Sequence, residues 1–102
     1  MPWKISISDS AKSDIKAIKK WYKEQSLQAV ENFIVELAST IESLKSETVE
    51  HKQVHGNYRR LLLNKFPYTI YYLRNEKDGF VQIIAVLHNR RDNDVIAKRF
   101  YE

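Results

Sequence analysis

The 102-residue sequence has no cysteine, only two glycines and two prolines, and no apolar run long enough to span a bilayer. Without cysteine it has neither disulfides nor a thiolate zinc site, which suits a reducing compartment. It also lacks a glycine-rich phosphate loop, internal repeats and an apolar N-terminal signal region. We therefore expect a cytoplasmic protein with no membrane association and no cofactor.

Length and charge bound the class of protein. A chain of this length forms one domain, 1–102, and area scaling suggests that about two thirds of its unfolded surface is buried on folding. Seventeen Lys and Arg against thirteen Asp and Glu give a net charge of +4. The acidic residues concentrate before residue 51, whereas the stretch from Tyr58 to Arg74 carries cations only. This local basic field favours nucleic acid or an acidic protein as partner, and a solvated basic face is the alternative.

The first half of the sequence predicts a strand followed by two helices. Residues 3–8 alternate apolar and polar side chains, as a half-buried strand does. Ser8, Asp9 or Ser10 can cap a helix, and residues 24–26 break its register before a second helix. Apolar residues at spacings of three and four predict an amphipathic αα-hairpin. They are Ala11, Ile15, Ile18 and Tyr22, then Leu27, Val30, Ile34, Leu37, Ile41 and Leu44.

Residues 48–57 show no apolar period and are predicted to form a loop. The loop contains His51 and His55, whose spacing of four would suit a metal site on a helix. No third ligand lies nearby in the sequence, so we expect two exposed imidazoles and no metal.

The second half predicts an antiparallel sheet. Pro67 marks a bulge, an edge position or a junction between strands, and Asp78-Gly79 favours a hairpin turn. The predicted fold is α+β with two layers, in the order β-α-α-β-β-β plus a short C-terminal helix. The second-half elements are strands over 58–65, 68–73 and 80–87, a turn at 75–79 and a helix over 94–100.

The order of elements and the stretch from Tyr58 to Asp92 resemble the RelE/ParE superfamily, the toxins of type II toxin–antitoxin modules. The likeness covers essentially the whole chain, and its most specific part is Ala85-Val86-Leu87-His88-Asn89-Arg90-Arg91-Asp92. Many members of the plasmid-stabilisation type end their core strand with Val-Leu-His followed by Arg-Arg-Asp. The other points of contact are the αα-hairpin, Tyr58-Arg59-Arg60, and Phe66-Pro67-Tyr68 with Ile70-Tyr71-Tyr72.

This resemblance implies growth inhibition through one of two targets. ParE-like members inhibit DNA gyrase, whereas RelE-like members are mRNA interferases that cut messenger RNA on the ribosome without a metal. Both kinds are neutralised by a cognate antitoxin protein, which implies a toxin–antitoxin hetero-oligomer. A non-toxic binding domain of the same fold is the third interpretation.

The candidate site residues follow from what each target requires. In a nuclease, His88 would act as acid or base while Arg90 and Arg91 hold the phosphate. Tyrosines would stack a splayed base. Alternatively, His88 caps the strand, the arginines pair with nearby carboxylates or the antitoxin, and the tyrosines pack in the sheet. The proposed target- or phosphate-binding set is Arg59, Arg60, Lys65, Tyr68, Tyr71, Arg90 and Arg91, with Tyr72 as a further candidate for stacking.

Two departures weaken the nuclease interpretation. RelE-like enzymes commonly have Arg after the Tyr of the third-strand pattern, where this chain has Thr69 after Tyr68. They also use a Tyr in the terminal segment, whose counterpart here falls near Ile96, with Tyr101 further on. The sequence therefore favours a ParE-like toxin that acts by binding, with cleavage as the alternative. In either case we expect the cations to gather where the last long strand ends.

Overall fold

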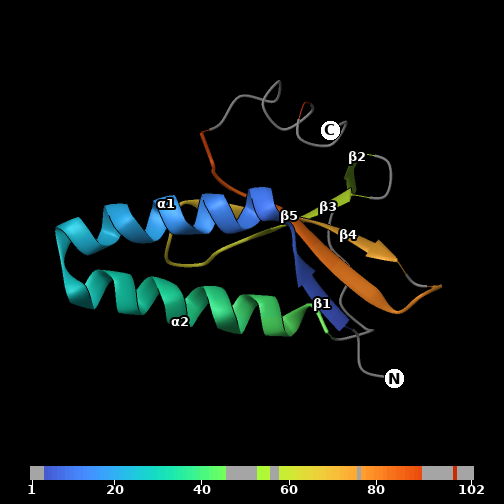
Figure 1. Ribbon diagram of the computed structural model, residues 1–102, viewed down its shortest axis with the longest axis horizontal. Helices are drawn as coiled ribbons and strands as arrows, with labels where there is room; N and C mark the ends of the chain where they lie inside the picture. Colours follow the sequence, from blue (N-terminus) through green and yellow to red (C-terminus); the bar gives the residue numbers. More distant parts are fainter. Residues whose placement is uncertain (1–3, 46–52, 56–57, 76, 91–97, 99–102) are drawn as a thin grey trace.

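The computed structural model describes residues 4–45, 53–55, 58–75, 77–90 and 98 of the chain. These residues form two helices and five strands (Figure 1). The elements are β1 (Lys4–Ile7), α1 (Asp9–Gln25), α2 (Leu27–Ser43), β2 (Gln53–His55), β3 (Tyr58–Leu62), β4 (Tyr68–Asn75) and β5 (Phe80–His88). Neither helix in these ranges combines the length and apolar character needed to cross a membrane.

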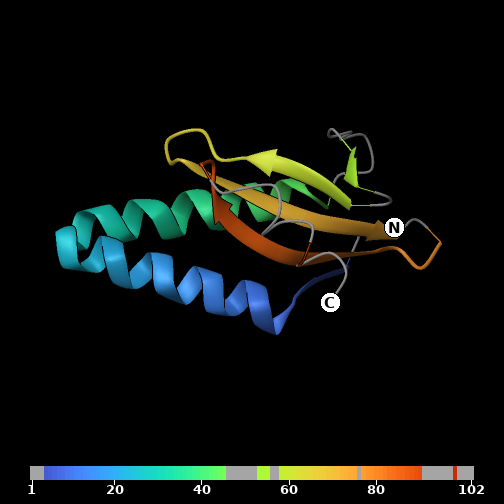
Figure 2. The ribbon, with the colours of Figure 1, turned by 90° about the horizontal axis from the view of Figure 1, so that it is seen from above.

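The molecule has two layers, an αα-hairpin and a sheet, as the sequence predicts. The strand order is β1-β5-β4-β3-β2. Figures 1 and 2 show the two helices lying side by side and reaching beyond the ends of the strands. The hairpin therefore covers one face of the sheet and overhangs the end where β5 stops.

Three parts of the predicted sheet need correction. The sheet is mixed, because β1 pairs with β5 in parallel, with Lys4 opposite Phe80. Parallel neighbours require a long connection, which the helices and the other strands supply, and the alternation of residues 3–8 carries no information on direction. The short strand β2 lies inside the predicted loop 48–57 and pairs with β3. Strand β3 ends at Leu62 instead of residue 65.

Of the remaining predicted features, Pro67 lies within the described residues, whereas most of the C-terminal helix and of the loop lies outside them. Pro67 lies at the junction between β3 and β4, one of the three places predicted for it. The predicted helix over 94–100 lies outside the described residues apart from Lys98, which is helical. His51 and the rest of the predicted loop outside β2 also lie beyond them.

Two serines set the limits of the helices. The Ser8 hydroxyl accepts a hydrogen bond from the backbone N–H of Ala11 and so caps α1. The Ser26 N–H donates to the carbonyl of Tyr22 at the end of α1, while the Ser26 hydroxyl accepts from Ala29 N–H at the start of α2. One residue thus ends the first helix and begins the second, which makes the hairpin tight.

A β-bulge in β5 divides its apolar side chains between the two faces of the sheet. Tyr71 pairs with Ala85 and Tyr72 pairs with Ile83, so Ile84 is the extra residue. Residues before and after the bulge therefore reach the same face despite their odd and even numbers. The main core lies between this face and the helices, and it includes Ala11, Ile18, Phe33, Leu37, Leu44, Leu63, Ile70, Tyr72, Val81, Ile83 and Val86.

The opposite face of the sheet carries a second, smaller apolar cluster. It consists of Tyr71, Ile84, Ala85 and Leu87, with Tyr58 packed against it. Because the strand β5 is apolar on both faces, it is the central strand that the sequence predicts. Its end is therefore fixed from both sides, which gives the residues that follow a rigid support.

Candidate functional site at the end of strand β5

The turn after β5 is attached to the neighbouring strand by hydrogen bonds. The Asn89 backbone N–H donates to the carbonyl of Pro67 at 2.9 Å. Thr69 is only 4% exposed, and its hydroxyl donates a hydrogen bond to Asn89 Oδ1 at 2.6 Å. Since these contacts hold Asn89 to Thr69 in β4 and to Pro67 just before that strand, they also fix the exposed residue that follows Asn89, Arg90.

The ring of His88 is oriented by this turn. The backbone N–H of Arg90 donates to His88 Nδ1 at 3.1 Å. A nitrogen that accepts this bond carries no proton, so the neutral ring has its proton on Nε2 and presents a donor there. While the bond stands, His88 has no free basic nitrogen. With Nδ1 engaged in this way, the ring presents Nε2–H as a hydrogen-bond donor to a partner.

An aromatic cluster joins this end of the sheet to both helices. Tyr68 pairs with His88 across the strands, and their rings meet edge to face with centroids 5.3 Å apart. Tyr68 also contacts Tyr22 of α1, whose ring stacks on Phe33 of α2 at 5.5 Å. Burial raises the pKa of the Tyr22 phenol, with smaller contributions from the charge of Tyr68 and the hydrogen bond to it. Phe66 completes the cluster.

A cleft lies between α1 and the end of β5, and we call it the α1-side cleft. Its volume is about 250 Å³. One wall is fixed by Asp14, whose carboxylate accepts a hydrogen bond from the backbone N–H of Val86 at 3.0 Å. At its rim stands Trp21, which is 53% exposed. The cleft is lined by Asp14, Ala17, Ile18, Trp21, Tyr68, Val86, Leu87 and His88.

A second, larger groove runs beside α2, and we call it the α2-side groove. Its volume is about 570 Å³. Glu36 fixes its wall, because both carboxylate oxygens accept from the backbone N–H of Lys65, at 3.0 and 3.3 Å. The groove is lined by Asn32, Val35, Glu36, Ser39, Thr40, Asn64, Lys65 and Phe66. It shares no residue with the α1-side cleft.

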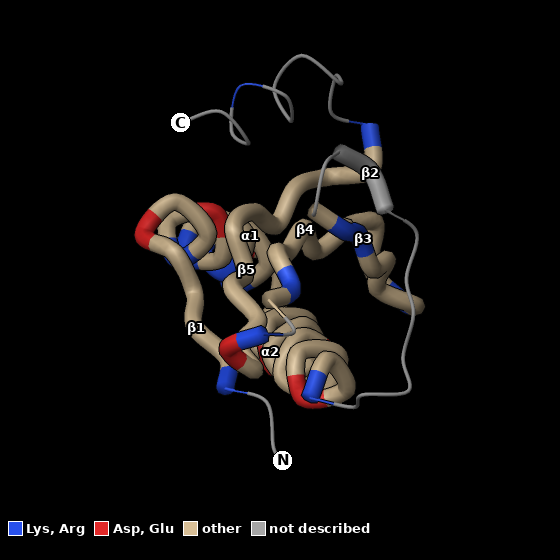
Figure 3. Tube along the Cα trace, turned by 90° about the vertical axis from the view of Figure 1, so that its right-hand side faces the viewer, with Lys and Arg blue, Asp and Glu red and all other residues tan. Residues whose placement is uncertain are grey.

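The arginines of β3 are not at the end of β5. Arg59 pairs with Tyr72 and Arg60 with Tyr71, whereas His88 pairs with Tyr68. Three to four residues along a strand correspond to about 10–13 Å, and two strand spacings separate β3 from β5. Figure 3 shows Lys and Arg distributed around the described chain. The prediction that Arg59 and Arg60 gather with the cations after β5 is therefore wrong.

The two tyrosines beside these arginines are core residues. Tyr71 is 6% exposed in the second cluster, and Tyr72 is 1% exposed in the main core. Burial raises the pKa of both phenols, and the nearby arginines partly offset that effect. Neither ring presents an open face to a base, so these tyrosines pack in the sheet as the alternative interpretation had it.

Several contributing residues were not singled out from the sequence. Thr69 was noted only as a departure from RelE-like enzymes, yet it anchors the turn after β5. Trp21 lies three residues after Ile18, where the helical register predicts packing, but the structure leaves it 53% exposed. No sequence pattern identifies Asp14 and Glu36 as contributing residues, because their partners are backbone amides distant in sequence.

The described residues contain no group of three or more His, Asp or Glu side chains placed to hold a metal ion. Arg91 lies outside the described residues. Within the described ranges, the candidate sites considered are the turn after β5 with its α1-side cleft, and the α2-side groove.

Comparison with known proteins gives the family. The family model for the ParE toxin of the type II toxin–antitoxin system parDE matches residues 5–93. A search of curated proteins finds no match. The fold is similar to that of a chain of the chromosomal ParDE system from P. aeruginosa, with a TM-score of 0.63 and 20% identity over 84% of this chain and 95% of that one.

A free double mutant of the E. coli toxin RelE is also similar, with a TM-score of 0.53 and 15% identity over 100% of this chain and 94% of the other. At these identities the two structures show the fold, whereas the family model spans almost the whole sequence. The paired helices, the sheet and the match from residue 5 to residue 93 agree. The chain belongs to the ParE toxin family of type II toxin–antitoxin systems, within the RelE/ParE superfamily.

Proposed function

We propose that this toxin acts in the cytoplasm and arrests growth by binding DNA gyrase, without cleaving RNA. The observation that carries this proposal is the hydrogen bond from Arg90 N–H to His88 Nδ1. Metal-free cleavage needs a group that exchanges a proton at the phosphate. The one imidazole at the end of β5 has its basic nitrogen occupied, which suits contact with a protein surface.

The distribution of cations supports the same conclusion. A cleavage site must bring several cations to one phosphate, yet Arg59 and Arg60 lie about 10 Å or more along the sheet from the His88 level. Lys65 lies in the loop before β4, with its backbone fixed by Glu36. Separated charges of this kind complement an extended acidic protein surface better than a single phosphate.

We further propose that the cognate antitoxin neutralises the toxin by occupying the α2-side groove. Val35 on its wall is 67% exposed, and Leu27 and Ile34 of the same helix are 67% and 41% exposed. Exposed apolar side chains along one helix are typical of a docking surface for a partner segment. Lys65 adds a cation to the groove, so the segment it suits is apolar and acidic.

Two assays on the purified toxin test the target. One measures DNA supercoiling by gyrase, and the other measures cleavage of messenger RNA on programmed ribosomes. We expect inhibition of supercoiling and intact messenger RNA. Cleavage on the ribosome with normal supercoiling would overturn the proposal.

The arginines after β5 should be essential for growth arrest. We expect Arg90→Ala with Arg91→Ala to abolish arrest on expression while leaving the circular dichroism spectrum unchanged. The matched control is Lys4→Ala with Lys77→Ala, which removes the same charge at the other end of β5, where Lys4 pairs with Phe80. Arrest that persists in the arginine double mutant would exclude this turn as the target site.

Replacement of His88 separates binding from catalysis. His88→Gln keeps a side-chain amide donor but removes the imidazole, so gyrase inhibition should change less than threefold. Loss of a general acid or base typically costs a factor of about 10² to 10⁴ in rate. A decrease of that size in growth arrest, accompanied by loss of messenger RNA cleavage, would favour the RelE-like alternative.

A further inference from the structure

We propose that the α1-side cleft is the contact site for the target protein, and that it takes one large aromatic or aliphatic side chain from an acidic segment. This inference rests on the proposed function, because it assigns a place on the toxin to the target. It is separate from the groove assigned to the antitoxin, with which it shares no lining residue.

The size of the cleft fits a single side chain. Sites for small molecules usually have volumes of about 300–1,000 Å³, and this cleft has about 250 Å³. Its apolar lining residues include the buried Ile18 and Val86 and the exposed Ala17. A phenyl or branched aliphatic group would exchange water for apolar contact there, which is the main source of affinity at such points.

The rim of the cleft has the composition of a protein-binding hot spot. Trp21 is half-exposed and is held by an edge-to-face contact with Tyr22, at 5.0 Å between ring centroids. The tethered ring of His88 lies on the lining with its Nε2–H available as a donor. Tryptophan and tyrosine are enriched at the centres of interfaces, where a preorganised ring loses little entropy on binding.

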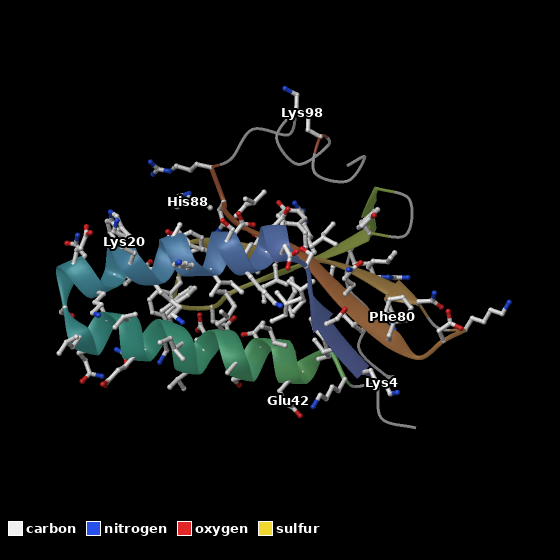
Figure 4. The ribbon with its side chains drawn as sticks, viewed as in Figure 1. Lys4, Lys20, Glu42, Phe80, His88 and Lys98 are labelled. Carbon is white, nitrogen blue, oxygen red and sulfur yellow. The ribbon has the colours of Figure 1, made fainter. Side chains whose placement is uncertain are left out.

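Charge around the cleft points to an acidic segment. Lys20 precedes Trp21, Arg90 follows His88 by two residues, and both side chains are exposed. Figure 4 shows Lys20 and His88 projecting on the same side of α1. Asp14 is the anion on the lining, and its carboxylate is directed at the backbone N–H of Val86. Carboxylates flanking the inserted side chain would meet these two cations, which neighbour the lining residues Trp21 and His88 in the sequence.

The same features disfavour a nucleic acid. A nucleotide would bring its phosphate to a cleft whose wall carries the Asp14 carboxylate. The rings of a stacking platform must also lie open along a strand of bases, whereas Tyr68 is half-buried beneath His88. A single anchored side chain with acidic neighbours satisfies both the shape and the charge.

The first experiment titrates labelled toxin with a defined probe and follows the backbone amide signals of Val86 and His88 by NMR. The probe is the acetylated and amidated peptide Glu-Asp-Phe-Glu-Asp, used up to 5 mM. Its counterparts are the same peptide with Gly in place of Phe, and a five-residue oligothymidylate. We expect saturable shifts with the Phe peptide only. Equal binding of the Gly peptide, binding of the oligonucleotide alone, or no shift at all would overturn the proposal.

Matched variants locate the contact. Trp21→Ala should weaken binding of the Phe peptide about thirtyfold, the loss expected for one hot-spot side chain. Leu62→Ala removes a similarly exposed apolar side chain on β3, outside the cleft, and should leave binding unchanged. Lys20→Glu should weaken binding more than Lys4→Glu, since Lys4 lies at the opposite end of the molecule (Figure 4). Equal losses in the members of either pair would contradict the assignment.

The gyrase assay then distinguishes this inference from the proposed function. If wild-type toxin inhibits supercoiling and Trp21→Ala inhibits equally well, the cleft is not the target site although the function stands. If wild-type toxin does not inhibit, the proposed function fails, and with it the assignment of the cleft to that target. The peptide titration still decides whether the cleft binds an acidic segment.

Discussion

The two helices attach to the sheet by the same chemistry at two different places. Asp14 of α1 accepts from the backbone N–H of Val86 within β5, and Glu36 of α2 accepts from the backbone N–H of Lys65 in the loop before β4. In each case a helix carboxylate satisfies an amide of the sheet layer. A cleft opens beside each attachment, lined in part by the same carboxylate.

The difference between the two attachments lies in burial and in what each one positions. The Asp14 bond is partly buried and fixes the end of the central strand, whereas the Glu36 bond is exposed and fixes a loop. Strand β5 runs past the last paired residue of β1, which is Ile7 opposite Ile83. Asp14 therefore accepts a hydrogen bond from β5 at a point beyond its pairing with β1. The α1 side should be the more rigid of the two, and the α2 side the more adaptable.

The largest stability effect should come from Asp14. We expect Asp14→Ala to lower the free energy of unfolding by about 2 kcal/mol, because a partly buried amide loses a charged acceptor. Urea denaturation followed by circular dichroism measures this loss. Asp14→Asn is the control, since its side-chain oxygen still accepts a hydrogen bond and should cost less. A loss below about 0.5 kcal/mol for Asp14→Ala, the low end for any hydrogen bond, would remove the distinction between the two sides.

A smaller effect is expected at Glu36. Water can replace the carboxylate at the exposed Lys65 amide, so Glu36→Ala should lower the free energy of unfolding by about 0.5–1 kcal/mol. Hydrogen exchange should nonetheless show faster exchange of the Lys65 amide, with the Val86 amide unchanged. If Glu36→Ala were to destabilise the protein more than Asp14→Ala, the order of rigidity proposed for the two sides would be reversed.

The smallest effect concerns Tyr22, which joins the two sides through the aromatic cluster. Its pKa is raised above the model-compound value of 10.0, first by burial and then by Tyr68. The unfolded chain therefore loses this proton at lower pH than the folded protein. The stability that comes from this difference in the Tyr22 pKa is fully present below pH 10 and is lost as pH rises through the folded pKa.

Thermal unfolding measured between pH 9 and pH 11 checks this prediction. Tyr22→Phe should show a shallower decrease in Tm with pH than the wild type. Tyr71 and Tyr72 have raised pKa values as well, so some decrease should remain in the variant. Identical slopes in the two proteins would mean that the Tyr22 phenol titrates alike in the folded and unfolded chains.

The two sides also differ in how much of their structure could be predicted from the sequence. Periods of three and four placed both helices, and residues 24–26 placed the break, where Ser26 lies. Of the six apolar residues predicted to line one seam of α2, Val30, Leu37 and Leu44 are buried, whereas Leu27 and Ile34 are exposed. Periodicity identifies an apolar stripe, but the width of the neighbouring layer decides how much of the stripe is covered.

The candidate site was predictable only in part, for the same reason. The position of Arg90 beyond the last long strand follows from the order of residues. Its separation from Arg59 and Arg60 follows from the register between β3, β4 and β5. A basic residue contributes the same charge at any register, so no pattern of charge along the chain could have placed them.

The sequence by itself determined the helices, the apolar strands, the turn at Gly79 and the family, because each depends on residues close together in the chain. Only the tertiary structure decided that β1 runs parallel to β5, that Asp14 meets Val86 across 72 residues, and that Arg90 N–H occupies His88 Nδ1. Those outcomes depend on which backbone groups remain unpaired once the layers have packed. Local sequence propensity does not specify which backbone groups those are.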